Sequence, residues 1–339
     1  MQVTIRPLEA ANDADVLAVL AVQIEASARD LTDFPQPTLA NLRGRLLHPW
    51  PGTSHHSWVA DVDGAVVGLV DVGLPQLDNR HMAEVEVLVH PEHRRRGIGR
   101  ALHAHAVAFA REHGRTTMTG DHVTQLPDGP FRDPGFGAFA DAVGAKPALP
   151  EVRRRLDLNT VDMAAWDKLH AEALPHAEGY TPVRWIGGAP EEYVHDLVAL
   201  EARIVIDVPM GDLNWEPEKV DATRVRANEE VMRKRGRRNY SAGMRHDATG
   251  HLVAWTAISF DAGATEQAWQ QITIVDPGHR GHRLGLVVKI DNMRHTLEHE
   301  PALAVIDTWN AAENSFMISI NETLGFRAVD GWMARQQEL

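Results

Sequence analysis

The chain has 339 residues, of which 44% are hydrophobic and 24% charged, and its formal net charge is −13. A length of this order suggests two domains of about 100–200 residues each. The chain has no cysteine, which excludes disulfides, thiolate metal sites and a cysteine nucleophile. The acidic balance argues against a nucleic-acid partner. The first residues contain no apolar signal segment, and no apolar run approaches the ~18 residues of a membrane helix. We therefore expect a cytoplasmic protein without membrane contact, as a monomer or homodimer.

The first half of the chain alternates strand and helix signals. An Asp63-Gly64 pair between two β-rich runs predicts a hairpin. A third apolar run ends at Val89, and residues at helical spacing begin near Ala101. Strands are therefore predicted at residues 3–6, 57–61, 65–70 and 84–89, and helices from Asp13 and Ala101.

The second half repeats this order. Residues 89–99 align without a gap over residues 275–285, at an offset of 186, with Val, Pro, His, Arg and the last Gly identical. The surrounding elements repeat as well, so each copy is predicted to run β–α–α–β–β–β–α–β–α–β. We divide the chain into an N-terminal lobe (1–157), a linker (158–179) and a C-terminal lobe (180–339).

The segment from Arg94 to Gly99 has the pattern Arg-x-x-Gly-x-Gly between a strand and a helix. A helix N-terminus exposes unsatisfied N–H groups and carries about half a positive charge, so it binds anions. Gly97 and Gly99 permit close backbone approach. Arg94 and Arg100 supply cationic hydrogen-bond donors for phosphate. The pattern lacks the Gly-Lys-Ser/Thr of a P-loop and the Gly-x-Gly-x-x-Gly of a dinucleotide fold.

At these residues the sequence resembles the GCN5-related N-acetyltransferase (GNAT) family, and its tandem layout is similar to that of mycothiol synthase. The resemblance implies an α/β (α+β) fold of two lobes, each a mixed, mostly antiparallel sheet flanked by helices. It also implies an enzyme that transfers an acetyl group from acetyl-CoA to a primary amine of a small molecule. In the first copy it assigns cofactor binding to Val87, Leu88, Val89, Arg94, Arg95, Arg96, Gly97, Ile98, Gly99 and Arg100.

In the second copy the implied cofactor residues are Ile274, Val275, Arg280, Gly281, His282, Arg283, Leu284 and Gly285, with Asn310 and Asn314 from the C-terminal signature. Arg283 replaces the first glycine of the motif, which weakens the expectation of close approach there. Neither copy has the family's tyrosine, because Ala140 and Asn321 stand at its place.

Glu86 and, second, Glu84 are the candidate general bases. They lie at i and i+2 on one strand and therefore share a face, and the family places its base there. Three alternatives stay open: a non-catalytic acyl-CoA-binding protein, a peptide or protein amine as acceptor, and a longer acyl group. His295-Thr296-Leu297-Glu298-His299 has the spacing of a zinc protease motif. We interpret it instead as the helix after the second loop and expect no metal.

Overall fold

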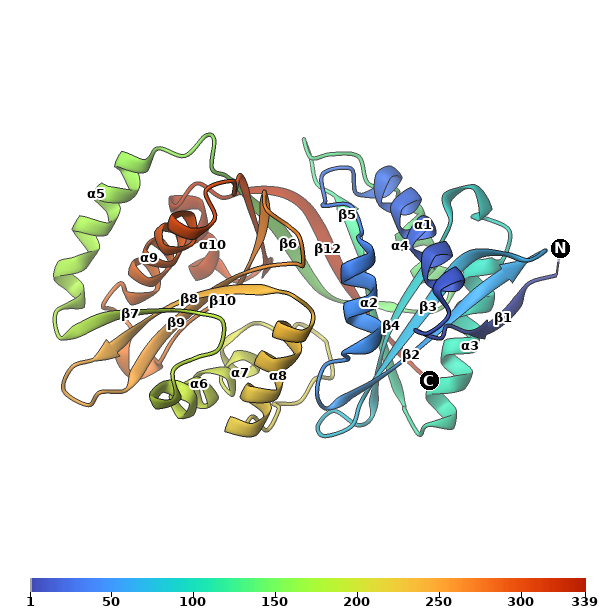
Figure 1. Cartoon of the computed structure of the whole chain (residues 1–339), viewed down its shortest axis with the longest axis horizontal. Helices are drawn as coiled ribbons and strands as arrows, with labels where there is room; N and C mark the ends of the chain where they lie inside the picture. Colours follow the sequence, from blue (N-terminus) through green and yellow to red (C-terminus); the bar gives the residue numbers. More distant parts are fainter. Residues whose placement is uncertain (1) are drawn as a thin grey trace. The chain divides into compact units, whose positions relative to one another are not determined.

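The computed structural model describes residues 2–339, which form two compact units (Figure 1). The N-terminal unit contains the residues up to Glu151 together with Met210–Glu216 and Asp330–Leu339. The C-terminal unit contains Val152–Pro209 and Pro217–Val329. Each unit holds one copy of the repeated loop. The division of the sequence at residues 157 and 180 stays a prediction.

The elements of the first copy follow the predicted order. They are β1 (Thr4–Pro7), α1 (Asp13–Asp30), α2 (Leu39–Leu47), β2 (Thr53–Val62), β3 (Ala65–Pro75), β4 (Met82–Val89), a 3-10 turn η1 (Pro91–His93), α3 (Ile98–Glu112), β5 (Thr117–Gln125), α4 (Gly135–Ala142) and β6 (Lys146–Asp157).

The second copy adds a four-residue helix, α7, to the predicted order. Its elements are α5 (Met163–Ala173), η2 (Leu174–Ala177), β7 (Tyr180–Ile186), η3 (Glu191–Tyr193), α6 (Val194–Glu201), α7 (Ile204–Asp207), α8 (Ala222–Lys234), β8 (Arg238–His246), β9 (Leu252–Phe260), β10 (Gln267–Val275), η4 (Pro277–His279), α9 (Leu284–His299), β11 (Val305–Ala311), α10 (Ser315–Thr323) and β12 (Arg327–Glu338).

Local sequence explains where several elements begin and turn. The side chain of Asn12 accepts a hydrogen bond from the Asp15 N–H and caps α1. Asp63 and Gly64 both have positive φ (54° and 84°), as a two-residue hairpin turn requires, and the hairpin of β2 with β3 is confirmed. Gly250 at φ 78° lies in the corresponding turn between β8 and β9.

The sheet of each unit is mixed, which confirms the predicted fold class. In the N-terminal unit the strand order is β1-β2-β3-β4-β5-β12, antiparallel except for the parallel pair β4 and β5. In the C-terminal unit it is β11-β10-β9-β8-β7, with β10 and β11 parallel.

Helices cover both faces of each sheet. In the N-terminal unit, α1 and α2 bury Val16, Val19 and Leu42 against one face. On the other face, α3 buries Ile98 and Leu102. In the C-terminal unit, α6 packs on one face, and α9 lies on the other between the sheet and α5. The first face of the N-terminal sheet carries the polar side chains described below.

The core of the N-terminal unit gives a direct stability test. Leu102 is fully buried, whereas Leu17 on α1 is 51% exposed. We expect Leu102→Ala to lower the free energy of unfolding by about 2–5 kcal/mol, because it removes buried methyl groups and leaves a cavity. Leu17→Ala should change it by less than about 0.5 kcal/mol. Urea denaturation followed by circular dichroism measures both, and equal losses would contradict this packing.

Candidate active site

The loop after β4 presents free backbone donors at the start of α3. Arg95 and Gly97 have left-handed backbone conformations, with φ of 62° and 84°. Gly97 is the N-cap and offers no side-chain cap. The first intrahelical bond at this end joins the Ala101 N–H to the Gly97 carbonyl at 3.0 Å. The N–H groups of residues 98–100 have no acceptor among the described residues, so this turn can bind an anion.

The loop after β10 follows the same backbone path with the glycine moved. Gly281 and Arg283 have φ of 87° and 54° and correspond to Arg95 and Gly97. Arg283 therefore adopts the left-handed conformation that Gly97 has in the first copy. The Leu286 N–H is already bonded to the Arg283 carbonyl at 3.1 Å. The second loop thus leaves one fewer free N–H group than the first.

Arg94 holds the first loop in place through an ion pair. Its guanidinium makes two hydrogen bonds to Asp30, the last residue of α1, one of 2.9 Å to Oδ1 and one to Oδ2. Its Nε donates to the Val89 carbonyl at 3.1 Å. Arg94 is therefore engaged within the protein. The exposed cations at this loop are Arg95, Arg96 and Arg100.

Arg280 repeats this arrangement in the second copy. Its guanidinium lies 2.8 Å from Asp207, the last residue of α7, and its Nε lies 3.4 Å from the Val275 carbonyl. Asp207 also pairs with Arg203 at 3.0 Å. Both loops are thus fastened to the end of a preceding helix by an arginine–aspartate pair.

A buried arginine fastens the next part of the N-terminal site. Arg132, 2% exposed, donates to Asp330 at 2.7 and 2.9 Å and to Asp33 at 2.5 Å. It also donates to the Asp30 carbonyl at 3.2 Å. A buried guanidinium needs such partners because desolvation of a charge is costly. Arg132 therefore fixes the segment between α1 and α2 against the segment between β5 and α4.

Carboxylates form a row across β3, β4 and β5. Asp71 pairs in register with Glu86, and Glu84 pairs with Thr119, which lies two residues before Asp121. Because paired residues of neighbouring strands point to the same face, Asp71, Glu84, Glu86 and Asp121 share one face of the sheet.

Arg45 from α2 partly neutralises this acidic row. Its guanidinium lies 3.0 Å from Glu86 and 3.4 Å from Asp71. The nearby Glu86 carboxylate raises the pKa of Arg45. Ser57 donates to Asp71 at 3.0 Å. Asp121 lies on β5, two strands away from Asp71 on β3.

The pKa of Asp121 is raised, although the residue is exposed to solvent. Desolvation and the negative charge of Glu86 raise its pKa to about 6. Desolvation and Asp121 also raise the pKa of Glu151 on β6. A base works best when its pKa lies near the operating pH. The sequence analysis did not identify Asp121. The fact that could have indicated it is its place on the fifth strand, at a position whose side chain lies on the same face of the sheet as Glu86.

The C-terminal unit has no carboxylate at the matching positions of β10. Gln270 and Ile272 replace Glu84 and Glu86, and the strand has a bulge between them. The buried Gln270 side chain donates to Thr256 Oγ1 and to backbone carbonyls at 2.8–3.0 Å. Half-buried tryptophans lie on this sheet, and the rings of Trp269 and Trp309 are 5.7 Å apart.

The C-terminal signature makes structural contacts in this structure. Asn310 Oδ1 accepts a 2.7 Å hydrogen bond from Asn321, which stands at the family's tyrosine position. Asn314 caps α10 by accepting from the Met317 N–H at 3.2 Å. Tyr240 donates to Glu300 at 2.6 Å, and burial raises its pKa to about 12, so it is a poor proton donor.

Comparison with known proteins gives matches in sequence and fold. The model of the acetyltransferase (GNAT) family matches residues 24–125. A tandem GNAT protein from the clavulanic acid biosynthesis pathway, solved without AcCoA, is 34% identical. That match covers 99% of this chain and 98% of that one, with a TM-score of 0.85.

Two further relatives are more limited matches. The mycothiol acetyltransferase of Stackebrandtia nassauensis is 37% identical over 123 residues, which span 35% of this chain and 38% of that protein. A GCN5-related N-acetyltransferase from Sphaerobacter thermophilus is 15% identical, with a TM-score of 0.66, and shares the fold.

Within residues 2–339, no helix combines the length and apolar character needed to cross a membrane.

The coupling of Asp121 to Glu86 can be measured. We expect Glu86→Gln to lower the pKa of Asp121 from about 6 toward its ordinary value, because the variant removes a neighbouring negative charge. Carboxyl-carbon NMR titration reports the change. Glu112→Gln, at the end of α3, is the control and should leave the pKa unchanged. An unchanged Asp121 in the Glu86 variant would show that the two groups do not interact.

Proposed function

This chain belongs to the GNAT family of acetyltransferases, and we propose that its N-terminal unit transfers the acetyl group of acetyl-CoA to a primary amine of a small cationic molecule. The observation that supports the proposal is the row of Asp71, Glu86 and Asp121 in the same unit as the loop with free N–H groups. An acidic row attracts an ammonium group, and a helix N-terminus attracts pyrophosphate.

The first loop suits the pyrophosphate of acetyl-CoA better than the second. It has the free N–H groups of residues 98–100 and three exposed arginines, Arg95, Arg96 and Arg100. No side-chain atom lies within 4 Å of a Cβ built on Gly97, so the backbone there is open to a ligand. In the second loop, Arg283 stands at this position and one N–H is already bonded.

The reaction is direct attack of the amine nitrogen on the thioester carbonyl. Only a neutral amine is nucleophilic, so the ammonium must first lose a proton, and Asp121 accepts it. The N–C bond then forms, the C–S bond breaks, and coenzyme A leaves as a thiolate, while the nitrogen releases its second proton to water. Water relays this proton to the thiolate, since Ala140 stands where the family has its tyrosine. Placing amine and thioester side by side supplies much of the rate gain.

Glu86 and Arg45 have a binding role in this proposal. Glu86 is exposed and lies 3.0 Å from Arg45, which competes with a substrate ammonium for the same carboxylate. A cationic substrate that binds Glu86 replaces the Arg45–Glu86 ion pair with its own. Surface ion pairs of this kind contribute only about 0–1 kcal/mol. Glu86 thus orients the substrate and raises the pKa of Asp121.

One observation favours a second function, acyl-CoA binding without catalysis. Neither Ala140 nor Asn321 can act as the acid that a tyrosine supplies, and Arg45 neutralises Glu86. The raised pKa of Asp121 favours the enzyme, because binding alone needs no such base. Acetyl-CoA turnover with a panel of diamines separates the two functions.

The base is tested by substitution and pH. We expect Asp121→Asn to lower kcat/KM by about 10²–10⁴-fold, the usual contribution of a general base. In the wild type kcat/KM should rise with pH through about 6, because the base is active only when deprotonated. The residual activity of the Asp121→Asn variant should lack this rise of kcat/KM with pH. A variant that keeps both rate and pH limb would exclude Asp121 as the base.

The cofactor loop is tested by a matched pair of variants. Gly97→Asp and Arg283→Asp put a carboxylate at equivalent positions, both with positive φ, which aspartate tolerates. Calorimetry with acetyl-CoA should show at least about tenfold weaker binding in Gly97→Asp, through charge repulsion, and little change in Arg283→Asp. The reverse result would assign the cofactor to the C-terminal unit.

A further inference from the structure

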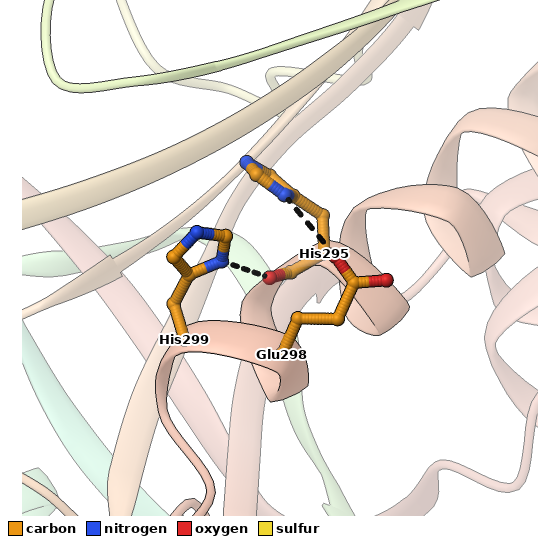
Figure 2. A group of neighbouring side chains, drawn as sticks. All are labelled: His295, Glu298 and His299. Carbon is orange, nitrogen blue, oxygen red and sulfur yellow. Dashed lines mark hydrogen bonds and ion pairs between the residues drawn. The ribbon is translucent and has the colours of Figure 1, made fainter.

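Contrary to the expectation from the sequence, we propose that His295, Glu298 and His299 at the end of α9 form a binding site for a zinc-class divalent metal ion in the C-terminal unit. The three residues lie at i, i+3 and i+4, so they share one side of the helix. One ligand atom from each lies within 4.8 Å of the others. Figure 2 shows the two imidazole rings side by side, with the Glu298 carboxylate next to His295.

His295 supplies the fixed ligand of this site. His295 is 8% exposed, and its Nε2 is buried without a hydrogen-bond partner. Its Nδ1 lies 4.0 Å from Glu298 Oε2, beyond hydrogen-bond distance. The Nδ1 atom is the one that faces the Glu298 carboxylate, so it is the ligand atom of this ring (Figure 2). The ring packs against Tyr240 at a centroid distance of 5.9 Å, which limits its movement.

His299 and Glu298 are the adjustable ligands. The Nδ1 of His299 bonds to the His295 carbonyl at 2.9 Å, which fixes the ring and leaves Nε2 available. A ligating histidine commonly holds its other nitrogen in such a bond. Zinc ligands lie about 2.0–2.2 Å from the ion, so ligand atoms must come within about 3.5 Å of one another. Both side chains are exposed and can close this gap.

Glu298 is the carboxylate left available in this region. Asp291 is held by the Arg184 guanidinium, and Glu300 is bonded to Arg238 and to Tyr240. Glu298 has only longer contacts, 3.7 Å to Arg184 and 4.0 Å to His295. An ion can therefore recruit Glu298 without breaking a short hydrogen bond.

The chemistry of the three side chains selects the ion. Two imidazoles and one carboxylate suit zinc and its neighbours rather than magnesium or calcium, which prefer oxygen ligands. Three protein ligands leave a fourth position for water. The site also lies at the C-terminus of α9, where the helix dipole favours a cation. The ion would stabilise the last turn of α9, the helix that follows the second loop.

The test uses the full chain without a histidine tag, treated with chelator and titrated with Zn²⁺ by calorimetry. We expect one tight site, with the affinity lowered at least about tenfold in His299→Ala and in Glu298→Gln. Both substituted residues are exposed, so the fold should persist. Co²⁺ should give the visible absorption of a tetrahedral site in the wild type and lose it in both variants.

The chain contains 19 histidines, so the control must report general histidine binding. His251 serves this purpose, because it is exposed and lies 2.9 Å from a carboxylate, Asp196. His251→Ala should bind Zn²⁺ like the wild type. Unchanged affinity in both His299→Ala and Glu298→Gln, or an equal loss in His251→Ala, would overturn the proposal.

Discussion

An arginine–aspartate ion pair fixes the geometry on which each copy of the fold depends. Arg94 reaches from the loop after β4 to Asp30 at the end of α1, and Arg280 reaches from the loop after β10 to Asp207 at the end of α7. Each arginine also bonds to the carbonyl of the last strand residue. Because its guanidinium is held from two sides, the loop keeps its left-handed turns and directs its N–H groups outward. In both copies the motif's arginine thus joins the loop to the preceding strand and to a helix end.

The two copies share this ion pair and differ in the side chains on the neighbouring strands. In the N-terminal unit the strands carry Asp71, Glu86 and Asp121, and desolvation together with the negative charge of Glu86 raises the pKa of Asp121 to about 6. In the C-terminal unit the matching strand carries Gln270 and Ile272, with half-buried tryptophans nearby. The loop suits an anion in both units, whereas only the N-terminal unit has a row of carboxylates that suits a cation.

The repeat and the loop pattern predicted the element order, because glycines, hairpin turns and apolar periodicity act locally. The extra helix α7 escaped prediction, since four residues carry too little periodicity to identify. The contacts of the site depend on residues far apart in sequence. Nothing near Arg94 in the chain indicates Asp30 as its partner, and the pKa of Asp121 depends on Glu86, 35 positions earlier. The sequence therefore predicts the loop, and the structure is needed to propose the base.

In our proposal the N-terminal loop holds the pyrophosphate of acetyl-CoA. A crystal structure of the full chain with acetyl-CoA tests it most directly. We expect pyrophosphate density within hydrogen-bond distance of the N–H groups of residues 98–100, with the thioester directed toward Glu86 and Asp121. Pyrophosphate density only at residues 284–285 of the C-terminal unit would contradict it.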